Sequence, residues 1–189
     1  MSYTYGIGGP TVNFEFGKYY HLYNRSNNEE IVFRTDENYI YFLQKYRSHL
    51  LNLVNTIAYC LMPTHFHFVV RVATTDEDTL RNTIGLLLSS YTKAINKRYH
   101  RHGGLFQPHT KAKEIFGDRY LLAVVSYIHQ NPVRAKKVVK LEDWPYSSYC
   151  DIAGMRYGTL PDKDFYSKYF KSEAEFKFFS ERMVAGIKI

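Results

Sequence analysis

Cysteine is scarce in this sequence of 189 residues. Cys60 and Cys150 are the two present, and they lie far apart without a CxxC motif. A disulfide framework or a cysteine-based zinc site needs more cysteines at closer spacing. The sequence therefore favours neither, and we expect a reducing compartment.

Long hydrophobic runs are also lacking. The longest apolar stretches, such as YLLAVVSYI, are much shorter than the ~20 residues that cross a bilayer. No stretch has the charged-then-apolar form of a secretory signal peptide, and there is no Gly-rich phosphate loop of the Walker type. We therefore expect a cytoplasmic protein that has no membrane partner.

Aromatic and basic residues are, by contrast, abundant. The aromatic share is 17%, with 18 Tyr and 13 Phe, and the formal net charge is +7. Residues 93–140 contain eleven Lys and Arg but two acidic residues, so this quarter of the chain carries +9. Such concentrated positive charge favours a nucleic-acid partner and a nucleoid-associated location. The alternative is a solvated helical face, with basic residues at helix C-termini.

The periodicity of apolar residues predicts alternating strands and helices. Helices are expected to begin at Asp36, at about Thr75 and at Asp118, the last one capped by Asp118 and ending near Gln130. The resulting order is β-α-β-β-α-β followed by an extra helix. This predicts an α+β fold: a ferredoxin-like (RRM-like) antiparallel sheet with helices on one face, plus an additional C-terminal helix that bears a tyrosine. Strands are expected at residues 18–26, 53–62, 65–72 and 111–116.

Three regions are predicted along the chain. Residues 1–16 are rich in Gly and have no sustained period, which indicates a loose N-terminal arm. Residues 17–150 contain the predicted sheet and its helices and form the main domain. Residues 151–189 combine mixed charges with clustered Phe and Tyr, which predicts a small C-terminal helical appendage.

The segment PTHFHFVVRV, residues 63–72, places two histidines in one strand. Side chains alternate along a strand, so His65 and His67 share one face while Phe66 and Phe68 share the other. The Phe side chains need the core, which leaves the imidazoles side by side on the opposite face, where both can reach one divalent cation. A bare HxH motif is more often a pair of polar residues on a half-exposed strand. A third ligand and a reactive group are needed to complete a site.

The last predicted helix, in DRYLLAVVSYIHQNPVRA, offers candidates for both. Leu121 and Ile128 belong to its buried stripe, and Tyr127 lies well off the centre of that stripe. Asn131 follows Tyr127 by one turn and could bring an amide oxygen to the same place. Two alternatives stay open: Tyr127 as a core-edge tyrosine, and Asn131 as the N-cap of a new helix that begins at Pro132.

In combination, several segments resemble the single-tyrosine HUH transposases, and most of all their REP-associated tyrosine transposase branch. The resemblance covers residues 17–150, in which the segments follow the order and approximate spacing of that family. Thr64 stands where the family often has Asn, in the turn before the histidine strand. The segments are YHLYNRS, AYCLMPTHFHFVVRV, YTKAINKRYHRHGGLFQ, SYIHQNPVRAKKVV and DWPYSSY.

The resemblance implies a role for each matching residue. His65 and His67 would be the metal-binding HUH pair, Tyr127 the nucleophile and Asn131 the third polar ligand. Arg134 would act on phosphate or in packing. The implied cofactor is Mg²⁺ or Mn²⁺, which would assist a tyrosine hydroxyl, a poor nucleophile at neutral pH. The implied reaction is cleavage and rejoining of hairpin-associated DNA through a 5′-phosphotyrosine intermediate.

The implied partner is single-stranded or hairpin DNA, bound by a monomer or by a homodimer. A flexible strand needs neutralisation of its backbone and stacking of its bases. Tyr19 and Tyr23 are candidates for base stacking. Basic residues are the candidates for DNA binding: Arg25, Lys93, Lys97, Arg98, Arg101, Lys111, Lys113 and Arg134.

Three other functions stay open. A non-catalytic single-stranded nucleic-acid-binding protein of RRM-like fold could use the same sheet. A metal-dependent hydrolase would use water in place of the tyrosine. A zinc site formed by Cys60, His65 and His67 is a weaker alternative, because Cys60 is better explained as a buried strand residue.

Overall fold

The computed structural model of the chain describes residues 13–182. Most of the predicted loose arm at residues 1–16, and residues 183–189 of the predicted appendage, lie outside this range. The helices and strands are β1 (Tyr19–Arg25), α1 (Asp36–Leu50), β2 (Val54–Met62), β3 (His65–Val72), α2 (Glu77–Arg98), β4 (Lys111–Ile115), α3 (Asp118–Arg134), α4 (Tyr149–Ile152), α5 (Lys163–Ser167) and α6 (Glu173–Glu181).

The four strands form one antiparallel sheet in the order β2-β3-β1-β4. With α1 between β1 and β2, and α2 between β3 and β4, this is the ferredoxin-like arrangement that the sequence predicts. β3 is an interior strand, flanked by β1 and β2. Its pairing with β1 places Tyr23 opposite His67 and Arg25 opposite His65.

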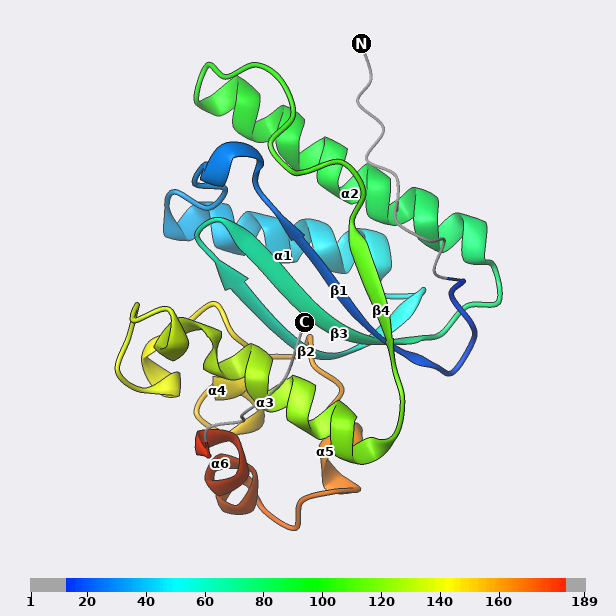
Figure 1. The fold of residues 1–189 in the computed structure, drawn as a ribbon, viewed down its shortest axis with the longest axis vertical. Coiled ribbons are helices and arrows are strands. Elements are labelled where there is room, and N and C mark those ends of the chain that lie inside the picture. Colours follow the sequence, from blue (N-terminus) through cyan, green and yellow to red (C-terminus); the bar gives the residue numbers. More distant parts are fainter. Residues whose placement is uncertain (1–12, 183–189) are drawn as a thin grey trace.

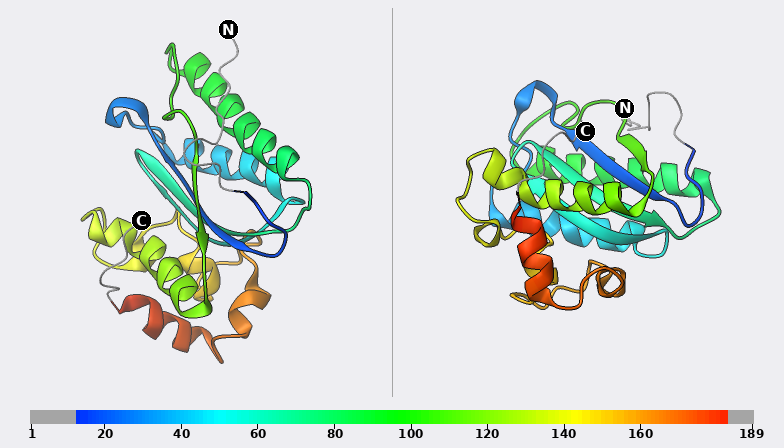
Figure 2. Two further views of the ribbon diagram at one scale, coloured as in Figure 1. Left: turned by 45° about the vertical axis from the view of Figure 1, so that its right-hand side comes forward. Right: turned by 60° about the horizontal axis from the view of Figure 1, so that its bottom comes forward.

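Helices cover both faces of the sheet, so the molecule has three layers (Figure 1). α1 and α2 lie on one face, whereas α3 lies on the other together with α4, α5 and α6, and two further views show the same layers (Figure 2). The predicted fold class is therefore confirmed, with α3 as the additional tyrosine-bearing helix. Among the helices of residues 13–182, none combines the length and the apolar character needed to cross a membrane.

Many of the abundant Tyr and Phe side chains lie in the core between the sheet and the helices α1 and α2. Tyr46 stacks on Phe68 with ring centroids 4.0 Å apart, and Phe42 meets Tyr91 edge-on at 5.0 Å. All four side chains are buried. Because such pairs stabilise a core beyond the area they bury, many of these rings stabilise the fold rather than form a binding surface.

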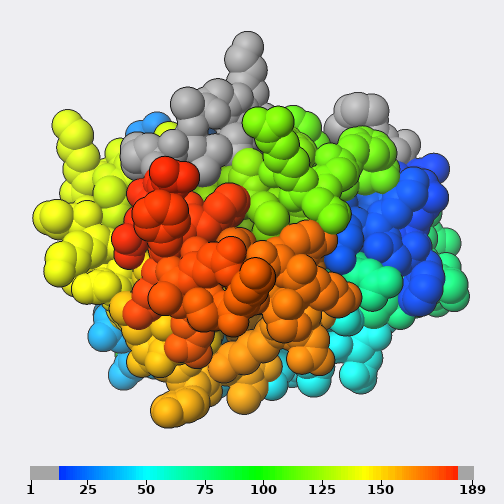
Figure 3. Space-filling model, turned by 90° about the horizontal axis from the view of Figure 1, so that it is seen from below, coloured from blue at the N-terminus to red at the C-terminus, as the bar shows by residue number. Residues whose placement is uncertain are grey.

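A second apolar cluster holds α3 against the opposite face of the sheet. Leu121, Val125 and Ile128, the predicted buried stripe of this helix, pack there with Cys60 and Val69 of the sheet. A fully buried side chain of this size stabilises the fold by about 1.5–3 kcal/mol. Side chains of α5 and α6 join the cluster, and Figure 3 shows their segment, orange to red, across the side of the molecule seen from below.

The ends of α3 differ from the prediction. The N-cap is Gly117, whose φ of 75° suits glycine, and Asp118 is the first helical residue rather than the cap. At the other end, α3 continues past Gln130 to Arg134 and includes Pro132 in its last turn. The prediction of an earlier end was wrong because the side-chain amide of Asn131 donates hydrogen bonds within α3, and the helix continues through Pro132.

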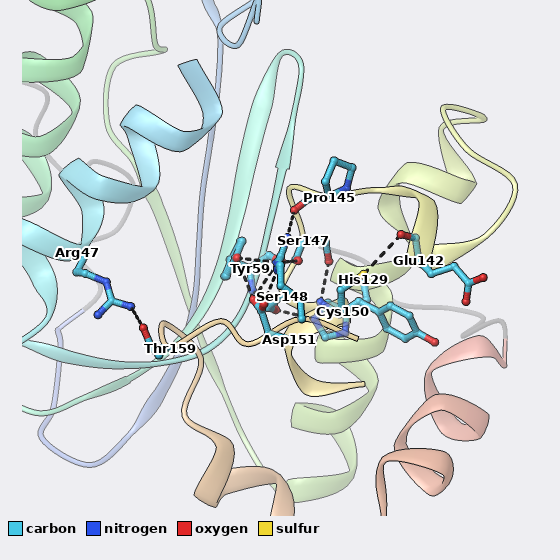
Figure 4. A network of polar contacts seen from close by, with 12 residues as sticks. Arg47, Tyr59, His129, Glu142, Pro145, Ser147, Ser148, Cys150, Asp151 and Thr159 are labelled. Atoms are coloured by element: carbon cyan, nitrogen blue, oxygen red, sulfur yellow. Dashed lines mark hydrogen bonds and ion pairs between the residues drawn. The ribbon is translucent and has the colours of Figure 1, made fainter. Parts of the chain in front are cut away.

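A buried polar network ties α3 to β2 (Figure 4). The Ser148 hydroxyl oxygen accepts a hydrogen bond from the backbone N–H of Tyr59 at 2.9 Å and lies 2.8 Å from Nε2 of His129 on α3. The Asp151 carboxylate accepts hydrogen bonds from the Tyr59 hydroxyl at 3.1 Å and from the Arg156 guanidinium at 2.9 Å. Together with the apolar cluster, this network fixes the position of α3 and of the residues it carries.

The buried ring of His129 makes the stability of the fold depend on pH. Burial lowers the pKa of His129 to about 3, whereas the unfolded chain titrates near about 6.5. The unfolded state therefore binds a proton that the folded state excludes, and stability falls as the pH drops below about 6.5. We predict that, between pH 7 and pH 5, the wild type loses about 2 kcal/mol more unfolding free energy than a His129→Gln variant does.

Urea unfolding of both proteins at the two pH values checks this prediction. The difference between pH values within one protein cancels the loss of stability that the substitution itself causes. An equal loss in the wild type and the variant would contradict it.

Candidate active site

His65 and His67 lie side by side on the sheet face that also carries α3. Their ring centroids are 5.1 Å apart and their planes meet at 82°. Phe66 and Phe68 point to the opposite face and into the core with α1 and α2. The structure therefore places both imidazoles on one face, as strand alternation predicts.

Each of the two imidazoles is hydrogen-bonded through Nδ1. Nδ1 of His65 lies 3.1 Å from the hydroxyl oxygen of Thr64, and Nδ1 of His67 lies 2.9 Å from Nε2 of His21. In the part of the chain that the structure describes, the Nε2 atoms of His65 and His67 have no hydrogen-bond partner. The Nε2 atoms are thus the ones that a metal ion would use.

These histidines are held in the neutral form. Burial, and then the charge of Arg25, lowers the pKa of His65 to about 4. Burial, and then the charge of Lys113, lowers the pKa of His21 to about 3. The pKa of His67 lies well below its ordinary value, again mainly because the ring is buried. Neutral imidazole is the form that binds metals, so protons do not compete with a metal ion at neutral pH.

The donor atoms around the pair restrict which metal ion fits. Within residues 13–182, no group of three or more His, Cys, Asp and Glu side chains is placed to hold a metal ion. A zinc site with Cys60 is therefore wrong, and burial also raises the pKa of this thiol and disfavours the thiolate. Two neutral imidazoles with oxygen ligands from an amide, a phosphate or water fit Mn²⁺, or Mg²⁺ that keeps several waters.

Tyr127 lies on α3, half-buried against the apolar cluster of the histidine face. That cluster includes Met62 of β2, which is paired with His65 of β3. The helix therefore lies on the side of the sheet that a nucleophile for this site requires. The guanidinium of Arg134 is 5.0 Å from the centroid of the Tyr127 ring, so a positive charge stands beside the phenol.

Asn131 has a structural role in α3 that its sequence context does not reveal. Pro132 has no backbone N–H, so the carbonyl of Ile128 lacks its usual helical donor. The side-chain amide of Asn131 donates hydrogen bonds to the carbonyl oxygens of Ile128 and Tyr127, both at 3.3 Å. Because the helix continues, the interpretation of Asn131 as the N-cap of a new helix is wrong. No hydrogen bond joins Asn131 to His65 or His67 in the described structure, and its role as a ligand stays a prediction.

Half of the predicted DNA-binding residues lie near the histidine pair. Arg25, Lys111 and Lys113 are exposed on β1 and β4, and the strand register gives them the same face as the histidines. Arg134 is exposed near the end of α3, in the layer that covers this face. The structure thus brings these four positive charges to one side of the sheet.

The other four basic residues are Lys93, Lys97, Arg98 and Arg101. They lie on α2 or just after it, in the layer across the sheet from the histidines. Arg98 forms an ion pair with Glu37 at 2.6 Å, and Arg101 pairs with Glu30. Their role in DNA binding stays a prediction, and the structure does not bring them to the histidine pair.

Analysis of the sequence missed His21 as part of this site. The alternation of residues 18–26 gives its face, but His21 and His67 lie far apart in the sequence. Only the pairing of β1 with β3, which sets His21 opposite Val69, brings the two rings together.

The fold and this site define a class: an α+β protein whose ferredoxin-like sheet carries a histidine pair and a tyrosine-bearing helix on one face. No protein-family model matches the chain. A Haemophilus influenzae protein named "Putative REP-associated tyrosine transposase" is 29% identical over 103 residues, which are 50% of this chain and 58% of that protein. The chain thus aligns with little more than half the length of this curated relative.

Solved structures show a similar fold. The structure of a REP-associated tyrosine transposase bound to a REP hairpin superimposes with a TM-score of 0.61, at 17% sequence identity, over 82% of this chain and 94% of that one. At this identity the likeness concerns the fold. The sequence comparison confirms the resemblance that the motifs indicate, and the structural comparison confirms the fold.

The effect of the Arg25 charge on the pKa of His65 can be tested by substitution. We predict that Arg25→Gln raises the pKa of His65 above about 4 but keeps it below about 6.5, because burial remains the main cause of the shift. Arg25→Lys retains the positive charge and should leave the pKa of His65 low. Titration of the imidazole signals by NMR checks both variants. Equal pKa values in the wild type and the glutamine variant would show that Arg25 does not act on this ring.

Proposed function

We propose that this protein is a metal-dependent transposase that cleaves and rejoins hairpin-associated single-stranded DNA through a 5′-phosphotyrosine intermediate. The observation that carries the proposal is the placement of His65, His67 and the Tyr127 helix on one face of the sheet. The similarity to REP-associated tyrosine transposases in sequence and fold supports it.

The surroundings of the histidine pair favour a single strand of DNA. Tyr23 stacks on His21 with centroids 4.6 Å apart, and the Lys111 ammonium lies 5.8 Å from the Tyr23 ring. Arg25 lies opposite His65 on the neighbouring strand. Aromatic rings next to exposed cations suit bases and phosphates of a flexible strand. Since the solved relative is bound to a REP hairpin, we propose a hairpin of that kind as the substrate.

His65 and His67 would hold Mg²⁺ or Mn²⁺ through their Nε2 atoms. The amide oxygen of Asn131 is the proposed third ligand, because the amide nitrogen is the atom that the helix uses. When bound, the ion would polarise the scissile phosphate and stabilise charge on the leaving oxygen. Burial keeps both imidazoles neutral and therefore ready to bind it.

Tyr127 would supply the nucleophile. Its phenolic oxygen forms a bond to phosphorus while the bond from phosphorus to the 3′ oxygen breaks, the phenolic proton passes to solvent, and the 3′ oxygen takes up a proton. The products are a 5′-phosphotyrosine and a 3′-hydroxyl. Because the phosphoester is exchanged rather than hydrolysed, another 3′-hydroxyl can attack the phosphotyrosine and reseal the strand without ATP. Arg134, beside the Tyr127 ring, would stabilise negative charge on the phosphate.

A non-catalytic RRM-like binder is the second candidate. The exposed Arg25, Lys111 and Lys113 favour it, because binding of phosphates needs no chemistry. RRM domains, however, stack bases on an open sheet, whereas Cys60 and Val69 on this face are fully buried in the cluster with α3. The transposase therefore agrees better with the structure.

Replacement of the tyrosine separates cleavage from binding. We predict that Tyr127→Phe abolishes the covalent protein–DNA product and leaves affinity for the hairpin within about threefold, because the phenyl ring keeps its packing. Labelled single-stranded REP-type hairpins, incubated with Mn²⁺ and run on a denaturing gel, report the adduct, and fluorescence anisotropy reports the affinity. Tyr120→Phe, on the same helix, is the matched control and should keep the adduct.

The outcome also decides between the alternatives. Cleavage that persists in Tyr127→Phe would indicate a hydrolase that uses water. If the wild type binds the hairpins but forms no adduct with any of them, in Mg²⁺ or in Mn²⁺, the protein is a binding protein.

Loss of a metal ligand should affect both binding of the ion and cleavage. We predict that His67→Ala weakens Mn²⁺ binding by at least about tenfold and abolishes the adduct. EDTA should abolish the adduct in the wild-type reaction as well. Titration with Mn²⁺ followed by electron paramagnetic resonance measures the affinity. His102→Ala, a change at an exposed histidine, is the control. Unchanged Mn²⁺ affinity in His67→Ala would remove this residue from the site.

A further inference from the structure

We infer that His21 is a positioning residue, which accepts the Nδ1 proton of His67 and so directs the Nε2 lone pair of His67 toward the metal site. The inference rests on the proposed function, because it assigns His67 as a metal ligand. It adds a residue that the sequence motifs do not assign to the site.

The contact between the two rings is short and buried. Nε2 of His21 and Nδ1 of His67 are 2.9 Å apart, the exposed fraction of His21 is 2%, and that of His67 is 9%. Two nitrogens at this distance, shielded from water, require one shared hydrogen. A hydrogen on both would clash, and a hydrogen on neither would set two lone pairs against each other.

The packing around the two rings fixes their orientation. The rings of His21 and His67 lie nearly parallel, with centroids 5.1 Å apart and planes at 18° to each other. Tyr23 stacks on His21 at 4.6 Å and lies 5.9 Å from His67. Three rings from two adjacent strands therefore restrict the tilt of one another's planes.

The shared hydrogen has two placements, and they differ in what His67 can do. If His21 donates, the proton of neutral His67 is on Nε2, and that nitrogen cannot bind a metal ion. If His67 donates, its proton is on Nδ1 and its lone pair is on Nε2. Nε2 of His67 has no hydrogen-bond partner within residues 13–182, so its lone pair is available to a metal ion. A ligating histidine is commonly oriented in this second way by an acceptor at its other nitrogen, and loss of the acceptor weakens metal binding by ~10–100-fold.

Two substitutions at His21 test the inference on the full chain. His21→Phe retains a ring for the stack but removes the acceptor, and His21→Gln retains a polar group whose oxygen can reach a similar position. We expect His21→Phe to weaken Mn²⁺ affinity by ~10–100-fold and His21→Gln to recover most of that loss. Circular dichroism of both variants checks that the fold is kept, and paramagnetic resonance measures the affinity.

A second readout reports the proton directly and needs neither metal nor DNA. Long-range ¹H–¹⁵N spectra of the metal-free protein distinguish a protonated Nδ1 from a protonated Nε2. We expect His67 to carry its proton on Nδ1 in the wild type and in His21→Gln, and to lose this preference in His21→Phe. A proton on Nε2 in the wild type, or an unchanged tautomer with unchanged Mn²⁺ affinity in His21→Phe, would overturn the inference.

The two readouts separate this inference from the proposed function. A wild type that forms no adduct and binds no Mn²⁺ would refute the proposed function. The tautomer of His67 in the metal-free protein would still decide, by itself, which ring donates the hydrogen.

Discussion

The register of β3 in the sheet is the constraint on which the site depends. Successive side chains of a strand face opposite sides, so a shift by one residue would send His65 and His67 into the core with α1 and α2, and Phe66 and Phe68 to the face that carries α3. The core with α1 and α2 is rich in aromatic rings, and imidazoles in place of Phe66 and Phe68 would be buried there without hydrogen-bond partners. Burial of these rings therefore fixes the register, and the register sets the imidazoles against α3.

The position of α3 follows from two kinds of contact. Apolar burial of its stripe against the sheet supplies most of the stabilisation, while the hydrogen bonds around Ser148 and His129 specify which part of α3 meets β2. The Asn131 amide extends the helix across Pro132. Tyr127 thus lies on a helix that packs on the sheet of the same chain. This residue therefore reaches the face of the histidine pair without a second subunit.

Local patterns predicted most of the fold. Alternation at β1 and β3 and the apolar stripe of α3 gave the sheet faces and the buried side of the helix, because these periods report burial directly. The exact ends of α3 were missed because they depend on the conformation of Gly117 and on the hydrogen bonds of Asn131. The basic residues of 93–140 lie close together in the sequence, yet the fold divides them between two layers.

The sequence by itself determined the residue types of the candidate site and the faces they occupy, because a period of two or of 3.6 residues ties burial to position in the chain. Only the tertiary structure decided which of these side chains meet. His21 and His67 become neighbours through the pairing of two strands that are distant in the chain. Whether a ring nitrogen has a hydrogen-bond partner depends on such pairing. The distance in space between two residues far apart in the chain cannot be read from the linear sequence.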